Sequence, residues 1–396
     1  MNPADTFKAL GPVRLAFLGS LLLSLIAAMN GALINKDGIF YVEAARAILE
    51  QGVGMMRQNA ALQFLPLLTA ALSKLTGLRL EAAAHLLNAL FLAGACSLVV
   101  AITRRRLPEA AWAACLVVLA MPAYNGYRGD ILREFGFWFF SILAFWLAMR
   151  WEESNRLHEA IAAQLALGCA ALFRLEAIAF FPALMLWQAF AAPSGHRLRR
   201  ACLIGCLPLA GIVVAAVLYG MGMLSIPDRL AYYLEAANPA RKIQLFKEAG
   251  IRMTEAVFRD KYSREEAAYV LFFGLLSIIP VKFIKMTGVF VVPLGFQLAA
   301  RQAGGRLARW QPMPWAFLTY VFVLSAFVTH NFFLTGRYVS MLNMLAVPIV
   351  AAGLILILRR FPRWRMLLMA LPGSDQASTI FSGRIATETV CPLAIP

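Results

Sequence analysis

The sequence predicts an all-α, polytopic bundle of about ten transmembrane helices, with amphipathic juxtamembrane helices in its outer loops. Composition is the first observation behind this prediction. Hydrophobic residues make up 61% of the 396 residues and charged residues only 15%, which is more apolar side chain than a soluble domain of this size buries. The second observation is that apolar runs of about 20 residues recur along the chain, separated by short loops rich in arginine.

The arginine-rich loops set the expected orientation, because basic loops stay on the cytoplasmic side of a membrane. They lie at residues 104–106, 197–200 and 359–365. The spans that keep all of these loops inside are expected at 13–30, 81–103, 109–123, 135–150, 159–173, 177–192, 201–223, 284–300, 314–329 and 338–358. The frequent use of arginine and alanine in this sequence favours a bacterial protein. We expect such a protein to lie in the cytoplasmic (inner) membrane.

One transmembrane domain is expected to cover residues 1–365. The tail at 366–396 is small and polar, so we expect it to be cytoplasmic and disordered. The outer loops are then expected at about 31–80, 124–134, 224–283 and 330–337.

Two further apolar stretches need a separate interpretation. Residues 61–77 could span the membrane, but a crossing there would move the basic loop at 104–106 outside, so we favour an interfacial position. Residues 267–300 are too long for one span, and Pro280 and two lysines interrupt them. We therefore expect an interfacial or re-entrant helix at 267–279, before the span at 284–300.

The first outer loop opens with an amphipathic helix, expected over 38–50. Val42, Ala45 and Ile48 recur at helical spacing, so one face is apolar. Asp37 stands at the head of this helix, just outside the first span. It fits an N-cap, because aspartate oxygens accept bonds from the free amides of a first turn. It also fits a catalytic carboxylate facing a substrate that arrives in the bilayer, and the two roles are compatible.

Polar side chains of the outer loops form the candidate site. Charge near the membrane is costly and often marks a functional site, although each residue alone also fits a solvated rim. The set comprises Lys36, Asp37, Tyr41, Arg46, Arg128, Asp130, Arg133, Glu134, Arg174, Glu176, Lys282, Lys285, His330 and Arg337.

Other functional classes are less well supported. The formal net charge of +16 could suit nucleic acid, but the basic residues cluster in loops between spans, which indicates orientation and contact with anionic lipid headgroups. We therefore expect no nucleic-acid partner. The six cysteines form no CxxC pair and the four histidines are scattered, so the sequence indicates no metal or other cofactor. The sequence leaves open whether the protein binds a divalent cation.

Four short motifs follow one another on the expected outer side. They are the segment at 37–46 after the first span, Asp130 or Glu134 before an aromatic-rich span, Phe173-Arg174-Leu175-Glu176 in a short turn, and Gly336-Arg337-Tyr338 at the start of a late span. In these motifs the chain resembles the GT-C membrane glycosyltransferases. It is most similar to the bacterial branch that resembles protein O-mannosyltransferases and the aminoarabinose transferase of lipid A. Gly38 stands where many members have a second acidic residue.

The resemblance implies an inverting transfer of a hexosyl or pentosyl group from a polyprenyl-phosphate donor. The acceptor would be a glycan, lipid or protein at the outer (periplasmic) face. Asp37 would be the general base, while Asp130 or Glu134 would orient the acceptor or hold cations. The donor phosphate needs basic side chains, for which the candidates are Arg133, Arg174, Lys282, Lys285 and Arg337.

Simpler interpretations stay open for some of these residues. Asp130 and Arg133 are three residues apart and fit a local pair on a helix surface. Arg174 fits an interfacial anchor whose aliphatic stem lies in the apolar layer. The alternative function is a transporter or flippase for a charged lipid or solute. That class usually places ionisable residues in the middle of its spans and often shows repeats, whereas the expected spans here are nearly free of charge.

Overall fold

The computed structural model describes residues 3–30, 34–52, 64–192, 194–221, 231, 238–256, 264–300 and 312–361. Within these ranges every regular element is a helix, and no strand occurs. Five of the described helices are long and apolar enough to cross a bilayer, or six if the bent pair at 197–204 and 206–220 makes one span. The expected class of all-α, multi-pass membrane protein is confirmed in this form, while the figure of about ten spans stays a prediction.

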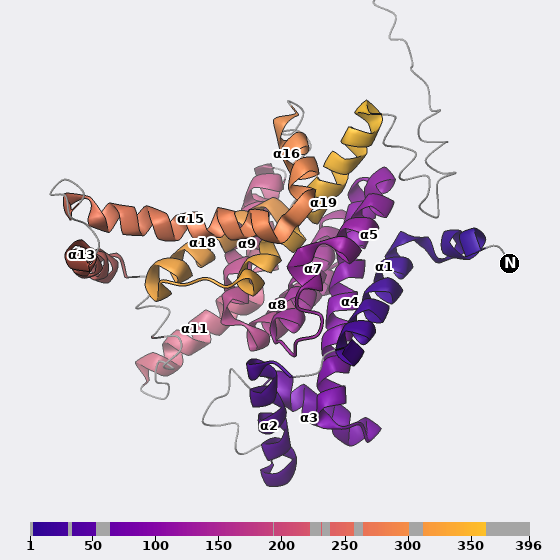
Figure 1. The fold of residues 1–396 in the computed structure, drawn as a ribbon, viewed down its shortest axis with the longest axis horizontal. Helices are drawn as coiled ribbons and strands as arrows, with labels where there is room; N and C mark the ends of the chain where they lie inside the picture. Colours follow the sequence, from indigo (N-terminus) through magenta and orange to yellow (C-terminus); the bar gives the residue numbers. More distant parts are fainter. Residues whose placement is uncertain are drawn as a thin grey trace, which may run out of the picture.

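Among the candidate spans, the helices Leu80–Arg106 and Gly336–Arg360 are the most buried, whereas the first helix and the long helix Ala267–Thr287 lie toward the margins of the fold (Figure 1). The candidate spans are α1 (Pro3–Asn30) from Leu10 onward, α4 (Leu80–Arg106), the pair α15 (Ala267–Thr287) and α16 (Val291–Ala299), α18 (Met313–Asn331) and α19 (Gly336–Arg360). The other described elements are α2 (Lys36–Gln51), α3 (Phe64–Thr76), η3 (Pro108–Ala110), α5 (Ala111–Ala120), α6 (Pro122–Asn125), α7 (Glu134–Ser154), α8 (Leu157–Phe173), η4 (Leu175–Ala179), α9 (Phe180–Ala191), η5 (Ser194–His196), α10 (Arg197–Ile204), α11 (Cys206–Gly220), α13 (Pro239–Ala256) and η6 (Gly288–Phe290).

Helices occupy most of each expected span, but several are shorter or more broken than the sequence suggests. α5 ends at Ala120, because the chain is extended at Met121 before the proline that starts α6. α8 and the segment Leu175–Ala191 are short apolar helices. α10 and α11 are bent by 68° at Gly205. The length and apolar character of these helices therefore do not show that each of them crosses the membrane.

The prediction that the helix breaks near Pro280 is wrong. α15 runs through this proline without interruption, and the chain breaks instead at Gly288, whose φ is +62°. Apolar helices in membranes tolerate proline when neighbouring groups satisfy the freed carbonyl, whereas a positive φ is available mainly to glycine. Lys282 and Lys285 consequently lie in the last turns of a long helix rather than in an outer loop.

The amphipathic helix expected after the first span is present as α2, and it ends at Gly52. Its buried face includes Tyr41, Val42, Ala45 and Ile48, which pack toward α3 and α4. α3 has 13 residues, so at about 1.5 Å per residue it is shorter than the hydrocarbon core. The two helices lie together at the lower end of the view in Figure 1, where they cover one end of α4.

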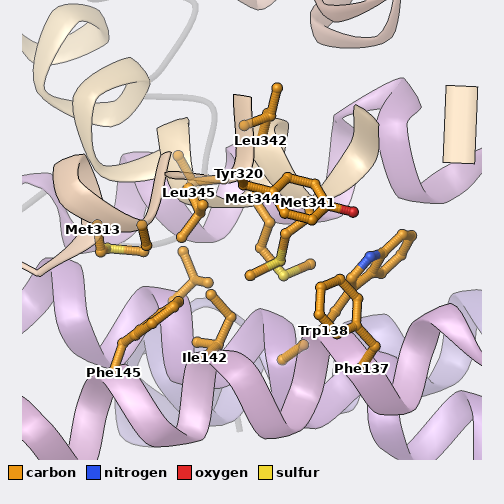
Figure 2. Packing of buried hydrophobic residues seen from close by; sticks show 14 of the residues in the cluster. Phe137, Trp138, Ile142, Phe145, Met313, Tyr320, Met341, Leu342, Met344 and Leu345 are labelled. Atoms are coloured by element: carbon orange, nitrogen blue, oxygen red, sulfur yellow. The ribbon is translucent and has the colours of Figure 1, made fainter. Parts of the chain in front are cut away.

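The core lies between α7 on one side and α18 and α19 on the other. Figure 2 shows Phe137, Trp138, Ile142 and Phe145 of α7 facing a methionine-rich surface of the two late helices. Their side chains are fully buried, and a core packed to this density holds its helices in fixed positions. The core therefore fixes the first residues of α7 and α19, on which the candidate site depends.

The two ends of α7 and α19 carry different charge arrangements. At the ends of α4 and α7, Arg106 pairs with Glu152 at 2.7 Å, and Arg359 of α19 lies 3.9 Å from Glu109 of η3. These basic clusters are separated by the full length of the helices from the first residues of α7 and α19. The candidate site and the basic clusters thus lie at opposite ends of the bundle.

Gly353 tests the packing of α19 on α16. A Cβ added there would lie 1.9 Å from the Pro293 carbonyl oxygen, so Gly353→Ala should destabilise the protein by about 1–3 kcal/mol. Gly274→Ala is the matched control, because its Cβ would meet no atom within 4 Å and alanine favours a helix. Thermal unfolding in detergent measures both variants, and equal melting temperatures would contradict this packing.

Candidate functional site

The Asn35 side chain connects the start of α2 to the loop that precedes α7 through two hydrogen bonds. Its side-chain oxygen accepts a bond of 2.9 Å from the Ile131 amide, and its side-chain amide donates to the Ile131 carbonyl at 3.3 Å. Gly38 permits this close approach, because an added Cβ would lie 2.6 Å from the Asn35 side-chain oxygen and 3.0 Å from the Ile131 Cβ. A second acidic residue at position 38 would therefore not fit.

Asp37 lies in the first turn of α2 and is not its N-cap. Asn35 holds the N-cap position, and it makes no side-chain capping bond. The Asp37 carboxylate instead forms an ion pair with Arg337, in the first turn of α19. The Asp37 side chain remains 38% exposed, so a ligand can reach it.

Glu134 is the buried centre of the site. Its carboxylate accepts a bond of 2.8 Å from the Arg174 guanidinium and lies 3.5 Å from Nε of Arg337. Arg174 also pairs with Glu176 at 2.5 Å. The side chains of Glu134 and Arg174 are each only 3% exposed, so this ion pair is removed from water. Arg174 is therefore not the interfacial anchor that the sequence left open.

Tyr338 supports both guanidinium groups. Cζ of Arg174 lies 4.2 Å and Cζ of Arg337 lies 5.3 Å from the centre of its ring, distances at which a cation is attracted to an aromatic face. Tyr320 of α18 is fully buried beside Arg174 and Glu176. The sequence did not identify either tyrosine as a site residue. For Tyr320, the signal available in the sequence was a tyrosine inside the apolar run of α18.

Arg133 and Asp130 complete the cluster without ion pairs. The Arg133 charge acts on Tyr41 and Glu176, yet in the described part of the chain Arg133 pairs with no carboxylate. Burial raises the pKa of Tyr41 to about 12, which keeps its hydroxyl neutral although Arg133 opposes the shift. Burial also raises the pKa of Asp130, against the effect of the nearby Arg337.

The local pair expected between Asp130 and Arg133 does not form. Residues 126–133 are not helical, so a spacing of three does not bring the two side chains onto one face. Asn88 of α4 donates to the Asp130 carbonyl at 3.3 Å, and the Tyr127 hydroxyl accepts a bond from the Arg337 amide. These contacts fix the loop against α4 and α19.

Arg128 points away from the cluster and toward α1. Its guanidinium donates to the Ser20 carbonyl and to the Ser20 and Ser24 hydroxyls of α1, each at 2.9 Å, and to Asn125 at 2.6 Å. Only 6% of Arg128 is exposed. The residue anchors the loop to α1 and lies apart from the other site candidates, so its contacts give no support to the prediction that it binds substrate.

Other expected residues also lie outside the cluster. Arg46 forms an exposed pair with Glu43 at 2.8 Å, and His330 lies beside Lys242 where α13 meets the end of α18. Lys36 is exposed. Lys282 and Lys285 lie on α15, and neither forms an ion pair with another described residue.

The arrangement can combine proton acceptance with anion binding. Two carboxylates, Asp37 and Asp130, are partly exposed, and several guanidinium groups lie within the same cluster. Among the described residues, no three His, Cys, Asp or Glu side chains are placed to hold a metal ion.

Arg174 and Arg46 provide a matched test of the buried network. Arg174→Met should cost about 3–5 kcal/mol of unfolding free energy, because Glu176 and Glu134 would keep buried charges without their main partner. Arg46→Met removes exposed ion pairs with Glu43 and Glu81 and should cost less than about 1 kcal/mol. Thermal unfolding in detergent compares the two, and similar losses for both variants would show that the network is not buried as described.

Comparison with known proteins leaves the function to be argued from this geometry. No protein-family model matches the chain, and no curated protein shows significant similarity to it.

Proposed function

We propose that the protein is a membrane glycosyltransferase of the GT-C type, which moves a sugar from a polyprenyl-phosphate donor to an acceptor hydroxyl. The acceptor oxygen forms a bond to the anomeric carbon, and its proton passes to Asp37. The bond between the anomeric carbon and the phosphate oxygen breaks, and the phosphate keeps the electron pair. The leaving group is already an anion, so the reaction needs cations more than a strong acid.

The exposure of Asp37 carries this proposal. A general base must reach the proton of an incoming acceptor, and the Asp37 side chain is 38% exposed. The side chains of Glu134 and Glu176 are only 3% and 8% exposed, so neither can reach the proton of an incoming acceptor. Their role in the proposal is to hold the guanidinium groups in place. Asp130, at the edge of the cluster, would orient the acceptor.

Arg133 is the first ligand for the donor phosphate in this proposal. Arg174 and Arg337 are already engaged by carboxylates, whereas Arg133 has none among the residues described. An arginine can bind two phosphate oxygens at once. The phosphate would then lie between Arg133 and Arg337, next to Asp37.

An apolar groove offers space for part of the prenyl chain. It lies between α8, α9 and α11, has a volume of about 550 Å3 and extends to Ile178 of η4, close to Arg174 in the sequence. The Gln164 side chain, which is polar and lines the groove, forms hydrogen bonds with backbone groups at Leu203 and Leu207. Its polar atoms therefore need no water molecule in the groove. Gly168 and Gly211 line opposite walls, and a Cβ added to either would meet no atom within 4 Å.

The basic clusters support an outer-face location for this chemistry. They lie at the opposite end of the bundle from Asp37, and basic clusters favour the cytoplasmic side. The proposal therefore puts the reaction at the periplasmic surface of a bacterial inner membrane, where the acceptor would be an envelope glycan, lipid or protein.

Asp37→Asn tests the role of the base. It should lower transfer of label from polyprenyl-phosphate sugars to envelope extract by about 100- to 10,000-fold, because the amide cannot accept the proton. Glu43→Gln is the control, since this exposed carboxylate lies on the same helix and pairs only with Arg46 in the described structure. Gel filtration checks the fold of both. Full turnover by a folded Asp37→Asn variant would remove the proposed base, and binding and movement of the lipid without transfer would favour a flippase.

Gly168→Leu tests the groove. The new side chain would fill space between α8 and α11 without a clash at its Cβ, so KM should rise for long-chain donors and stay unchanged for short-chain donors. Gly274→Leu is the control, because it adds the same side chain to an open helical position on α15. An equal effect on donors of both lengths would exclude the groove as the prenyl site.

A further inference from the structure

The proposed base is occupied in the structure. The Asp37 carboxylate oxygen Oδ2 accepts a bond from Nη1 of Arg337. An acceptor hydroxyl that approaches this oxygen must compete with Nη1 of Arg337 for it. The ion pair therefore hinders the approach of the acceptor to Asp37.

We infer that the donor phosphate unmasks Asp37 by drawing Arg337 away from it. The inference rests on the proposed function and adds an order of events to it. The lipid phosphate binds first, Nη1 of Arg337 turns from the aspartate to the phosphate, and only then can Asp37 accept a proton. An acceptor that arrives before the donor meets a masked base.

The surroundings of Arg337 allow its side chain to turn while its backbone stays fixed. Its amide donates to the Tyr127 hydroxyl, and Gly336 packs so closely on that hydroxyl that an added Cβ would lie 2.6 Å away. Nε of Arg337 lies 3.5 Å from Glu134, and the guanidinium rests on the Tyr338 ring. The contact with Glu134 can persist while the outer nitrogen changes partner.

A phosphate is a suitable competitor for this nitrogen. It carries at least one full charge and offers several oxygens, so it can bind a guanidinium in the two-bond geometry that a single Asp37 oxygen does not use. The pair is also accessible, since the side chains of Arg337 and Asp37 are 25% and 38% exposed. The buried pair of Arg174 and Glu134 offers no such access, with both side chains at 3%.

The reactivity of the Asp37 carboxyl toward a hydrophobic carbodiimide reports the unmasking directly. Trypsin releases residues 37–46 as one peptide, which also contains the exposed Glu43 as an internal standard. Mass spectrometry compares modification at the two carboxyls in the full-length protein, with and without saturating farnesyl phosphate. Farnesol and inorganic phosphate separate the effect of the tail from that of the anion.

Farnesyl phosphate should raise modification of Asp37 relative to Glu43 by roughly 5- to 150-fold, the usual range of coupling between two sites. Farnesol should have no effect. Arg337→Gln should leave Asp37 reactive without any ligand, and Arg133→Gln should weaken the response by reducing phosphate binding. Gel filtration verifies that both variants fold.

A thermal shift with farnesyl phosphate separates failure of this inference from failure of the proposed function. Binding without a change at Asp37 would overturn the unmasking and leave the glycosyltransferase proposal intact. A masked Asp37 in folded Arg337→Gln protein would also overturn it. Absence of any binding would remove the lipid-phosphate site, and the inference with it.

Discussion

The site depends on one buried carboxylate that two arginines share. Glu134 at the start of α7 contacts Arg174 from the turn after α8 and Arg337 from the start of α19. Two guanidinium groups repel each other, and each would be costly in a buried position without an anion. Their common partner therefore forces three distant segments to meet at one end of the bundle. Glu176 and the Tyr338 ring add further compensation for the same charges.

The loop before α7 fixes the position of this network relative to the neighbouring helices. Arg128 ties the loop to α1, Asn88 ties it to α4, and Asn35 ties it to α2. None of these three side chains forms a hydrogen bond with Asp37 in the described structure, but together they fix the backbone that carries Asp130, Arg133 and Glu134. The result is a rigid frame around a few exposed side chains, Asp37 and Arg337 among them. Such a frame suits chemistry in which side chains exchange partners while helices stay in place.

The sequence was sufficient for the class of protein and for the helix α2, because these follow from hydropathy and helical spacing. It also named the charged residues that meet around Glu134. It could not assign partners. Arg128 and Arg133 stand in the same short loop, and only the fold shows that one turns to α1 and the other to the cluster. Asp37 carries an N-cap signature, yet tertiary contact with Arg337 decides its conformation. Gly288 rather than Pro280 breaks the long apolar stretch, because proline remains compatible with a membrane helix when a positive φ is not required.

The contrast between the two ends of the bundle argues that the Glu134 network is kept for function. At the basic end, Arg106 and Glu152 are 23% and 31% exposed, and pairs of this kind contribute little to stability. The role predicted for them, orientation in the membrane, needs charge but no exact geometry. At the other end, Arg174 and Glu134 are buried, and an apolar pair of the same size would often be as stable or more stable. A protein that needed only a stable bundle would gain nothing from burying these charges. The arrangement is explained if the buried anions hold cations beside an exposed aspartate, where a substrate anion then competes for them.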